Sequence, residues 1–207
     1  MTDNEVLDKL IRTRRSVRAF TGEVPGRELI EQIIEAGRQA PYAKLAVAEN
    51  DDFRHFIVVP KSSPFIAKTK LLLIEAMKSR IAAMEASGDP KVQRVLEVLR
   101  PMVKAGLPAF ATGAWLVVVA ELRGIPNREA QSLGHVMENM WLKATALGLG
   151  FQLLSAVGDL ANSQTFCEML GLPCGAYALE SCTIGYPAQT LPRDVRSVPL
   201  RSVKWID

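Results

Sequence analysis

The chain has 207 residues, of which 48% are hydrophobic and 23% are charged, and its formal net charge is +3. This length and composition are typical of a soluble domain that buries a core without disulfides or metals. The small net charge does not favour a nucleic-acid partner, and the sequence has no run of about twenty apolar residues that could span a membrane. Because residues 1–5 are polar and unlike a signal peptide, we expect a cytoplasmic protein in which residues 1–207 form a single domain.

Cysteines and histidines give little sign of a metal site or a disulfide framework. Cys167, Cys174 and Cys182 are odd in number and form no Cys-x-x-Cys pair, so we expect reduced, buried thiols. The two histidines, His55 and His135, stand in no close Cys/His grouping, which does not favour a structural zinc site. We interpret His135, in the middle of an expected helix, as a packing residue.

The first half of the chain is expected to be largely helical. Asp3 or Asn4 can cap a first helix that continues to Ile11 and is followed by a basic segment. The later elements expected in this half are a helix over residues 27–39, a polar loop over 42–52, a buried strand over 56–59, and helices over 65–86 and 91–105.

The second half alternates strands with helices. In chain order, the expected elements are a strand over residues 115–120, a helix over 128–147 that Gly148 ends, a strand over 150–156, a short helix over 160–170 and a strand over 177–184. Strands interspersed with helices indicate an α+β or α/β protein in which helices pack against a sheet.

The basic segment, Arg-Arg-Ser-Val-Arg over residues 14–18, is a candidate phosphate site. Guanidinium groups bind oxyanions through paired hydrogen bonds, and a serine hydroxyl can add another. Because alternate side chains of an extended segment share a face, Arg14, Ser16 and Arg18 could converge on one phosphate. The alternative is a solvated basic turn.

Several common catalytic motifs are missing. Gly148-Leu149-Gly150 lacks the third glycine of a dinucleotide-binding loop and follows a helix. The sequence also has no P-loop and no Gly-x-Ser-x-Gly elbow, so hydrolytic and nucleotide-triphosphate chemistry is not favoured.

The order of five segments resembles the FMN-dependent nitroreductase family. They are residues 11–20 (IRTRRSVRAF), Ala40-Pro41, residues 56–59 (FIVV), residues 138–150 (ENMWLKATALGLG) and residues 184–187 (IGYP). The resemblance implies an α+β fold with a central, mostly antiparallel sheet flanked by helices. It also implies an interlocked homodimer with FMN at the subunit interface.

The resemblance assigns roles residue by residue. The positions that match those holding the FMN phosphate and ribityl chain are Arg14, Arg15, Ser16 and Arg18. Arg196 matches a C-terminal cation that reaches the same phosphate, and Arg193 could assist it. The residues matching the segment along the flavin ring are Leu153, Leu154, Ser155 and Ala156. A backbone N–H of Ser155 or Ala156 would then point at flavin N5.

The loop before residues 56–59 departs from the family pattern. Asn50 falls on the family asparagine and could bond the pyrimidine edge of the ring, whereas Asp52, Phe53 and Arg54 replace glutamine, proline and tryptophan. If Asp52 pointed inward, its charge would lower the reduction potential of the flavin. Tyr42 could line the pocket mouth, and so could Lys44; the alternative for both is an exposed loop.

The helices over about residues 61–107 correspond to a variable insertion that often forms a lid in the family. Apolar residues there, such as Phe65 and Phe110, would favour a hydrophobic aromatic or quinone-like substrate. The resemblance thus implies an enzyme that uses NADH or NADPH and FMN to reduce a nitroaromatic, a quinone or another small acceptor in ping-pong order. One alternative is a specialised flavoenzyme for dehalogenation or flavin fragmentation, and another is a non-catalytic flavin- or ligand-binding protein.

Overall fold

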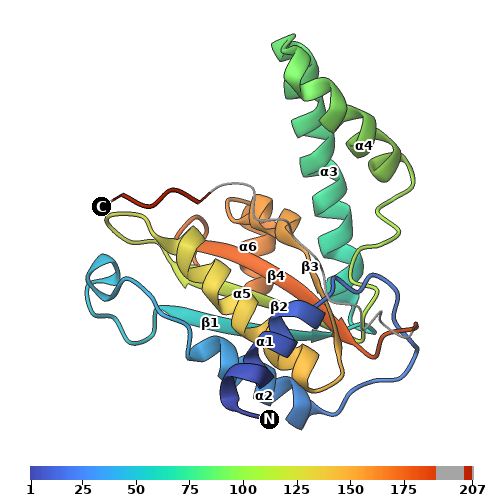
Figure 1. The fold of residues 1–207 in the computed structure, drawn as a ribbon. Helices are drawn as coiled ribbons and strands as arrows, with labels where there is room; N and C mark the ends of the chain where they lie inside the picture. Colours follow the sequence, from blue (N-terminus) through green and yellow to red (C-terminus); the bar gives the residue numbers. More distant parts are fainter. Residues whose placement is uncertain (190–202, 207) are drawn as a thin grey trace.

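The computed structural model describes residues 1–189 and 203–206, and Arg193 and Arg196 lie outside these residues. Its sheet contains β1 (Arg54–Pro60), β2 (Trp115–Leu122), β3 (Gly150–Leu153) and β4 (Tyr177–Gly185), in the order β1-β2-β4-β3. Each neighbouring pair is antiparallel. The α+β prediction with a central antiparallel sheet is therefore confirmed (Figure 1).

Helices cover both faces of the sheet. One face packs against α2 (Arg27–Arg38) and α5 (Glu129–Ala146), with α1 (Asp3–Thr13) outside α5. The other face packs against α3 (Pro64–Ser87), η3 (Ser155–Leu160) and α6 (Gln164–Leu170). The predicted helices over residues 27–39 and 128–147 are confirmed to within a residue or two at each end.

Strand β2 joins the two halves of the core. Its side chains alternate between the faces, so Val117 and Val119 pack towards α5 while Leu116 and Val118 pack towards α3. The strand expected over residues 56–59 is confirmed within β1, but its predicted burial is wrong in part, because β1 lies at the edge of the described sheet and Val58 is 37% exposed.

The prediction that Asp3 or Asn4 caps the first helix is wrong, because α1 begins with a capping box at Thr2. Thr2, rather than Asp3 or Asn4, is the N-cap, and its side chain accepts from the amide of Glu5. No residue of α1 is buried within the chain, and the side chains on its apolar stripe that stay exposed are Val6, Leu7 and Ile11.

The strand expected over residues 150–156 ends early, at Leu153. The Leu154 amide still donates to the Ser181 carbonyl of β4 at 2.8 Å, but the Val157 amide turns back to the Leu154 carbonyl at 3.1 Å. The resulting 3₁₀ turn buries Val157 and Leu160 beneath α3. Burial of these two side chains explains why the chain leaves the sheet here.

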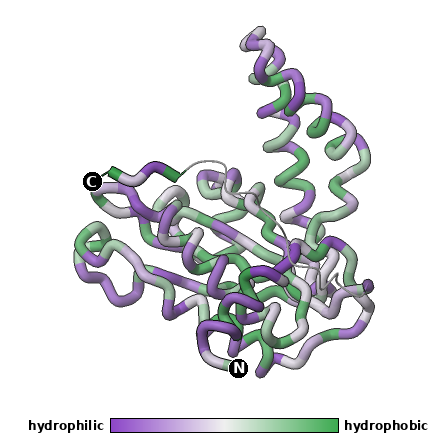
Figure 2. Tube along the Cα trace, viewed as in Figure 1, coloured by the Kyte–Doolittle hydropathy of each residue, from purple (hydrophilic) through white to green (hydrophobic). Residues whose placement is uncertain are grey.

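Helices α3 and α4 (Gln93–Lys104) form a hairpin that projects from the body of the molecule (Figure 1). Both carry hydrophobic stretches along their length (Figure 2). Leu73 and Met77 of α3 are buried in the core, whereas an ion pair of 2.6 Å between Arg100 and Glu85 joins the two helices. The two helices expected over residues 65–86 and 91–105 are confirmed.

Two single-residue expectations are wrong in part. Cys167 and Cys182 are free and buried as expected, but Cys174 is exposed in the turn after α6. His135 is exposed rather than packed, because the inward face of α5 is formed by its neighbours Leu133 and Val136. None of the described helices has the length and apolar character needed to cross a membrane.

Candidate functional site

The basic segment runs alongside strand β3, although more than 130 residues separate the two in the sequence. The Val17 amide donates to the Phe151 carbonyl at 3.0 Å, and Ser16 bridges Phe151 in parallel register. Val17 is 4% exposed, whereas Ser16 and Arg18 point to solvent. A Cβ on Gly150 would lie 2.7 Å from Val17, so this close approach requires glycine at that position.

Helix α5 fixes the first arginines of this segment. The Arg14 guanidinium lies 4.1 Å from the centre of a Trp141 ring, and its Nε is 3.1 Å from a Glu138 carboxylate oxygen. The Trp141 indole N–H donates to the Arg15 carbonyl at 3.1 Å. Arg15 itself donates to the carbonyl groups of Arg12 and Arg14. Ser16 and Arg18 are therefore the exposed donors, and Arg14 is a partly buried cation beside them.

Residues 153–156 continue from the same strand. The Ser181 hydroxyl donates to the Leu154 carbonyl at 3.0 Å, which fixes the main chain where it leaves β3. Ser155 and Ala156 are exposed, and no acceptor in the described part of the chain takes their amide N–H groups. From Phe151 to Ser155 an extended chain spans about 13 Å. The structure thus brings the basic segment and the exposed residues Ser155 and Ala156 onto one edge of the sheet.

An acidic residue that the sequence analysis missed lies beside these amides. Glu180 of β4 accepts from the Ser181 amide at 2.9 Å and from the Ser155 side chain. Burial raises the pKa of the Glu180 carboxyl, and the two hydrogen bonds offset part of that increase. Its only sequence signal is an acid within the apolar strand over residues 177–184, and strand pairing is needed to locate it beside Ser155.

The raised pKa of Glu180 predicts a dependence of stability on pH. Between the usual glutamate pKa and the raised value, the folded state binds more protons than the unfolded state, so stability falls as pH rises. Glu180→Gln should therefore raise the unfolding midpoint in urea at pH 7 to 8, with the advantage fading towards pH 4. Glu168→Gln, on the exposed surface of α6, is the matched control. An equal effect of Glu180→Gln at every pH would contradict this prediction.

The loop before β1 is closed by a buried ion pair. The Arg54 side chain is 5% exposed and its Nε lies 2.9 Å from a carboxylate oxygen of Glu121, which is 3% exposed. Arg54 also donates to the Ser132 hydroxyl at 2.8 Å, and that hydroxyl donates to Glu121. The Arg54 guanidinium lies 4.9 Å from the Phe53 ring, on which Tyr42 stacks at 4.0 Å. At the position where the family pattern has tryptophan, this chain therefore has Arg54, a buried cation paired with Glu121.

Asn50 lies on this loop, at the opposite edge of the sheet from the basic segment. Its side-chain oxygen accepts from the Asp52 amide at 2.9 Å. Asp52 is 87% exposed, and its carboxylate is 3.7 Å from a His55 ring nitrogen. In the order β1-β2-β4-β3 the loop precedes one edge strand, and residues 153–156 follow the other. Within one chain, the structure does not bring Asn50 to the other predicted site residues.

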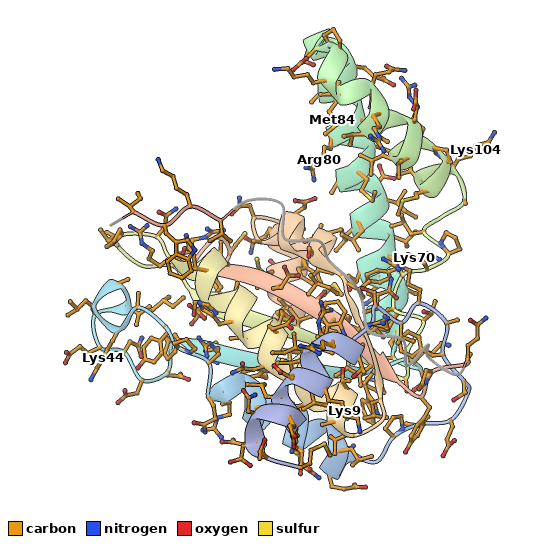
Figure 3. The ribbon with its side chains drawn as sticks, viewed as in Figure 1. Lys9, Lys44, Lys70, Arg80, Met84 and Lys104 are labelled. Atoms are coloured by element: carbon orange, nitrogen blue, oxygen red, sulfur yellow. The ribbon has the colours of Figure 1, made fainter. Side chains whose placement is uncertain are left out.

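The residues expected at the pocket mouth and the residue expected in the lid lie in different parts of the structure. Tyr42 lines a cavity of about 280 Å³ together with His135 and Ser132. Lys44 extends from the exposed loop (Figure 3). Phe65 packs on Phe166 in the core, with ring centres 5.8 Å apart, so it is not part of an open lid.

Phe110 lines a second, larger cavity of about 370 Å³ at the base of the α3–α4 hairpin. Other residues lining this cavity include Leu73 and Met77 of α3, Met102 of α4, and Gln152, Leu154 and Ala156. Near it, Arg80 of α3 reaches the body of the molecule, 3.0 Å from an Asp159 carboxylate oxygen (Figure 3). The hairpin is thus anchored next to residues 153–156.

Comparison with known proteins gives consistent similarities. Residues 11–186 match the sequence profile of the nitroreductase family. A protein of Archaeoglobus fulgidus, named as an NADH dehydrogenase/NAD(P)H nitroreductase, is 24% identical over 180 residues, which cover 86% of this chain and 84% of that protein.

Two solved structures share the fold. A nitroreductase with bound FMN from Desulfitobacterium hafniense has a TM-score of 0.71 at 23% identity, and the match covers 100% of both chains. A BluB-like flavoprotein from Clostridium difficile has a TM-score of 0.73 at 23% identity, covering 97% of this chain and 99% of that one.

Proposed function

The chain belongs to the nitroreductase family, and from this we propose that it is an FMN-dependent oxidoreductase that uses NADH or NADPH to reduce a small oxidised organic acceptor. The acceptor is a nitroaromatic compound, a quinone or a similar molecule. The names of the Archaeoglobus fulgidus and Desulfitobacterium hafniense proteins support the nicotinamide donor and FMN, respectively.

The observation that carries the proposal is the pairing of the basic segment with β3, which leads directly to the exposed residues Ser155 and Ala156. The donors suit a flavin mononucleotide. Exposed Ser16 and Arg18 can bind its phosphate, with Arg14 and Arg15 next to them. The Ser155 and Ala156 amides can orient the ring, a role that needs main chain and no particular side chain.

When bound, FMN supplies the redox chemistry by taking a hydride from the nicotinamide and passing electrons to the acceptor. The chain supplies position and charge. The Ser181 hydroxyl keeps the Leu154 carbonyl fixed, so the amides that follow it hold their orientation. The Glu180 carboxyl, hydrogen-bonded to Ser155, retains a proton at higher pH than an exposed glutamate does, because burial raises its pKa.

We also propose that the working form is a homodimer, each subunit a single domain with the α3–α4 hairpin as its lid. Two observations support a second copy: the apolar stripe of α1, where Leu7 is 50% exposed, is not covered by the described residues, and Asn50 is remote from the basic segment. A partner's loop could complete the site. Sedimentation should give twice the chain mass of 22.7 kDa.

Reduction of the bound flavin tests the proposed function. The protein loaded with FMN should lose its visible flavin absorbance when NADH or NADPH is added without oxygen, and regain it when a nitroarene or a quinone follows. Bound flavin that neither nicotinamide bleaches would contradict the proposal. Protein that fails to bind FMN at all would instead favour the ligand-binding alternative.

A further inference from the structure

Two of the three cysteines lie next to each other where α6 ends. Cys167 belongs to α6 and is 4% exposed, whereas Cys174 lies on the surface of the turn that follows this helix. Both side chains are free thiols. The Cys174 thiol hydrogen-bonds the Cys167 thiol. An exposed thiol is therefore in contact with a buried one.

Hydrogen bonds of the surrounding main chain hold the two thiols together. The Ala161 carbonyl accepts from the Cys167 thiol at 3.4 Å and from the Gly175 amide at 3.2 Å. Because Gly175 directly follows Cys174, this one carbonyl group fixes the chain on both sides of the contact. The Leu172 amide also donates to the Cys167 carbonyl, at 3.0 Å. The main chain of the turn therefore determines how close the two thiols lie.

The third cysteine lies too far away to join this contact. Cys182 of β4 belongs to the core between the sheet and α5, whereas Phe166, the neighbour of Cys167, belongs to the core on the opposite face. Burial also raises the pKa of the Cys182 thiol, which keeps it protonated and unreactive. Reaction of the cysteines with an oxidant should therefore be confined to Cys167 and Cys174.

The contact affects how readily Cys174 reacts. The hydrogen bond to Cys167 is the largest cause of the raised pKa of the Cys174 thiol, and desolvation and the charges of Cys167 and Glu168 raise it further. Because the thiolate is the form that attacks an oxidant, Cys174 should react slowly near neutral pH and faster as the pH rises. The pair is therefore suited to sustained exposure to an oxidant.

We propose that Cys167 and Cys174 form a reversible disulfide bond when hydrogen peroxide oxidises the exposed thiol. The Cys174 sulfur attacks the peroxide and the O–O bond breaks, which gives a sulfenic acid and one molecule of water. The Cys167 sulfur then attacks the Cys174 sulfur. An S–S bond forms, the S–O bond breaks, and the oxygen leaves with the Cys167 proton as a second molecule of water. The two thiols together lose two electrons and two protons, which the peroxide gains.

The test is peptide mapping of the purified, fully reduced protein after treatment with hydrogen peroxide. Free thiols are alkylated under denaturing conditions before digestion. We expect a disulfide bond between the Cys167 and Cys174 peptides and an alkylated Cys182, and dithiothreitol should restore all three thiols. The bond should form faster at pH 9 than at pH 7, because more of Cys174 is then thiolate.

Two variants separate the roles of the cysteines. Cys174→Ser removes an exposed thiol, so the fold should tolerate it, and peroxide should then leave Cys167 reduced. Cys182→Ala is the matched control, in which the disulfide bond should still form. Mapping of the parent protein identifies the bonded cysteines even if Cys182→Ala fails to fold.

The inference is overturned if both thiols of the parent protein stay reduced, or if Cys174 becomes a sulfinic or sulfonic acid without forming the bond. It is also overturned if Cys174 bonds to a second molecule, or if folded Cys182→Ala no longer forms the bond. The site is separate from the basic segment and from residues 153–156. None of these outcomes decides whether NADPH bleaches the flavin, so the proposed function is judged separately.

Discussion

Arg54→Met is expected to lower the free energy of unfolding by about 3–5 kcal/mol, the usual cost of removing one partner from a buried ion pair. The Glu121 carboxylate would remain 3% exposed without its cation. The Ser132 hydroxyl and the carbonyl groups of Gly37 and Ala40 would also lose a donor.

Denaturation in urea at neutral pH measures this effect. Arg38→Met is the matched control, because Arg38 and Glu35 form an exposed pair at 3.2 Å, which contributes at most about 1 kcal/mol. Adding Glu121→Leu to Arg54→Met should recover part of the loss, since no buried charge is then left unpaired. A loss in Arg54→Met no larger than in Arg38→Met would show that the pair is not buried in solution.

Arg18→Ala should weaken FMN binding by about ten- to a hundredfold, since a hydrogen bond to a charged group contributes about 1.5–3 kcal/mol. Ser16→Ala should act in the same direction and less strongly, because it removes a neutral donor. Neither side chain is buried, so the fold should tolerate both changes. Riboflavin, which lacks the phosphate, should bind equally to the parent protein and both variants.

Quenching of flavin fluorescence gives both dissociation constants. Lys9→Ala removes an exposed cation of α1 that lies outside the basic segment (Figure 3), and it should leave FMN affinity unchanged. If Arg18→Ala weakened the binding of FMN and of riboflavin equally, Arg18 would contact the flavin ring or stabilise the fold instead of binding the phosphate. If the variant binds both ligands as tightly as the parent protein does, the assignment of Arg18 to the phosphate is wrong.

The sequence alone predicted the elements whose positions depend on the local pattern of residues. Helices α2 and α5 follow from apolar spacing, and Gly148 ends α5 in a left-handed conformation with φ of 72°, as predicted. The end of β3 could not be found this way, because Ser181, which lies 27 residues from Leu154, fixes it. The exposure of His135 was missed because a histidine fits either face of a helix.

The candidate site was predictable only where function depends on main chain or on clustered charge. The basic segment is recognisable from its composition, and its pairing with Phe151 supports its assignment as a candidate phosphate site. The Arg54–Glu121 pair gave no local signal, and Glu180 gave only that of an acid in an apolar strand, since each matters through strand register or burial. The roles of Arg193 and Arg196 stay predictions, because both lie outside the described residues.

The hairpin leaves and re-enters the sheet at neighbouring points, and this gives the fold a place where its length can change. Pro60 of β1 pairs with Trp115 of β2, and the Lys61 amide donates to the Ala114 carbonyl at 2.9 Å. Strand register is therefore set without the intervening residues 62–113. Because Leu73 and Met77 belong to the core, only the distal part can vary freely. Descendants of this chain can lengthen, shorten or exchange that part, and so change what reaches the cavity, while the sheet stays as it is.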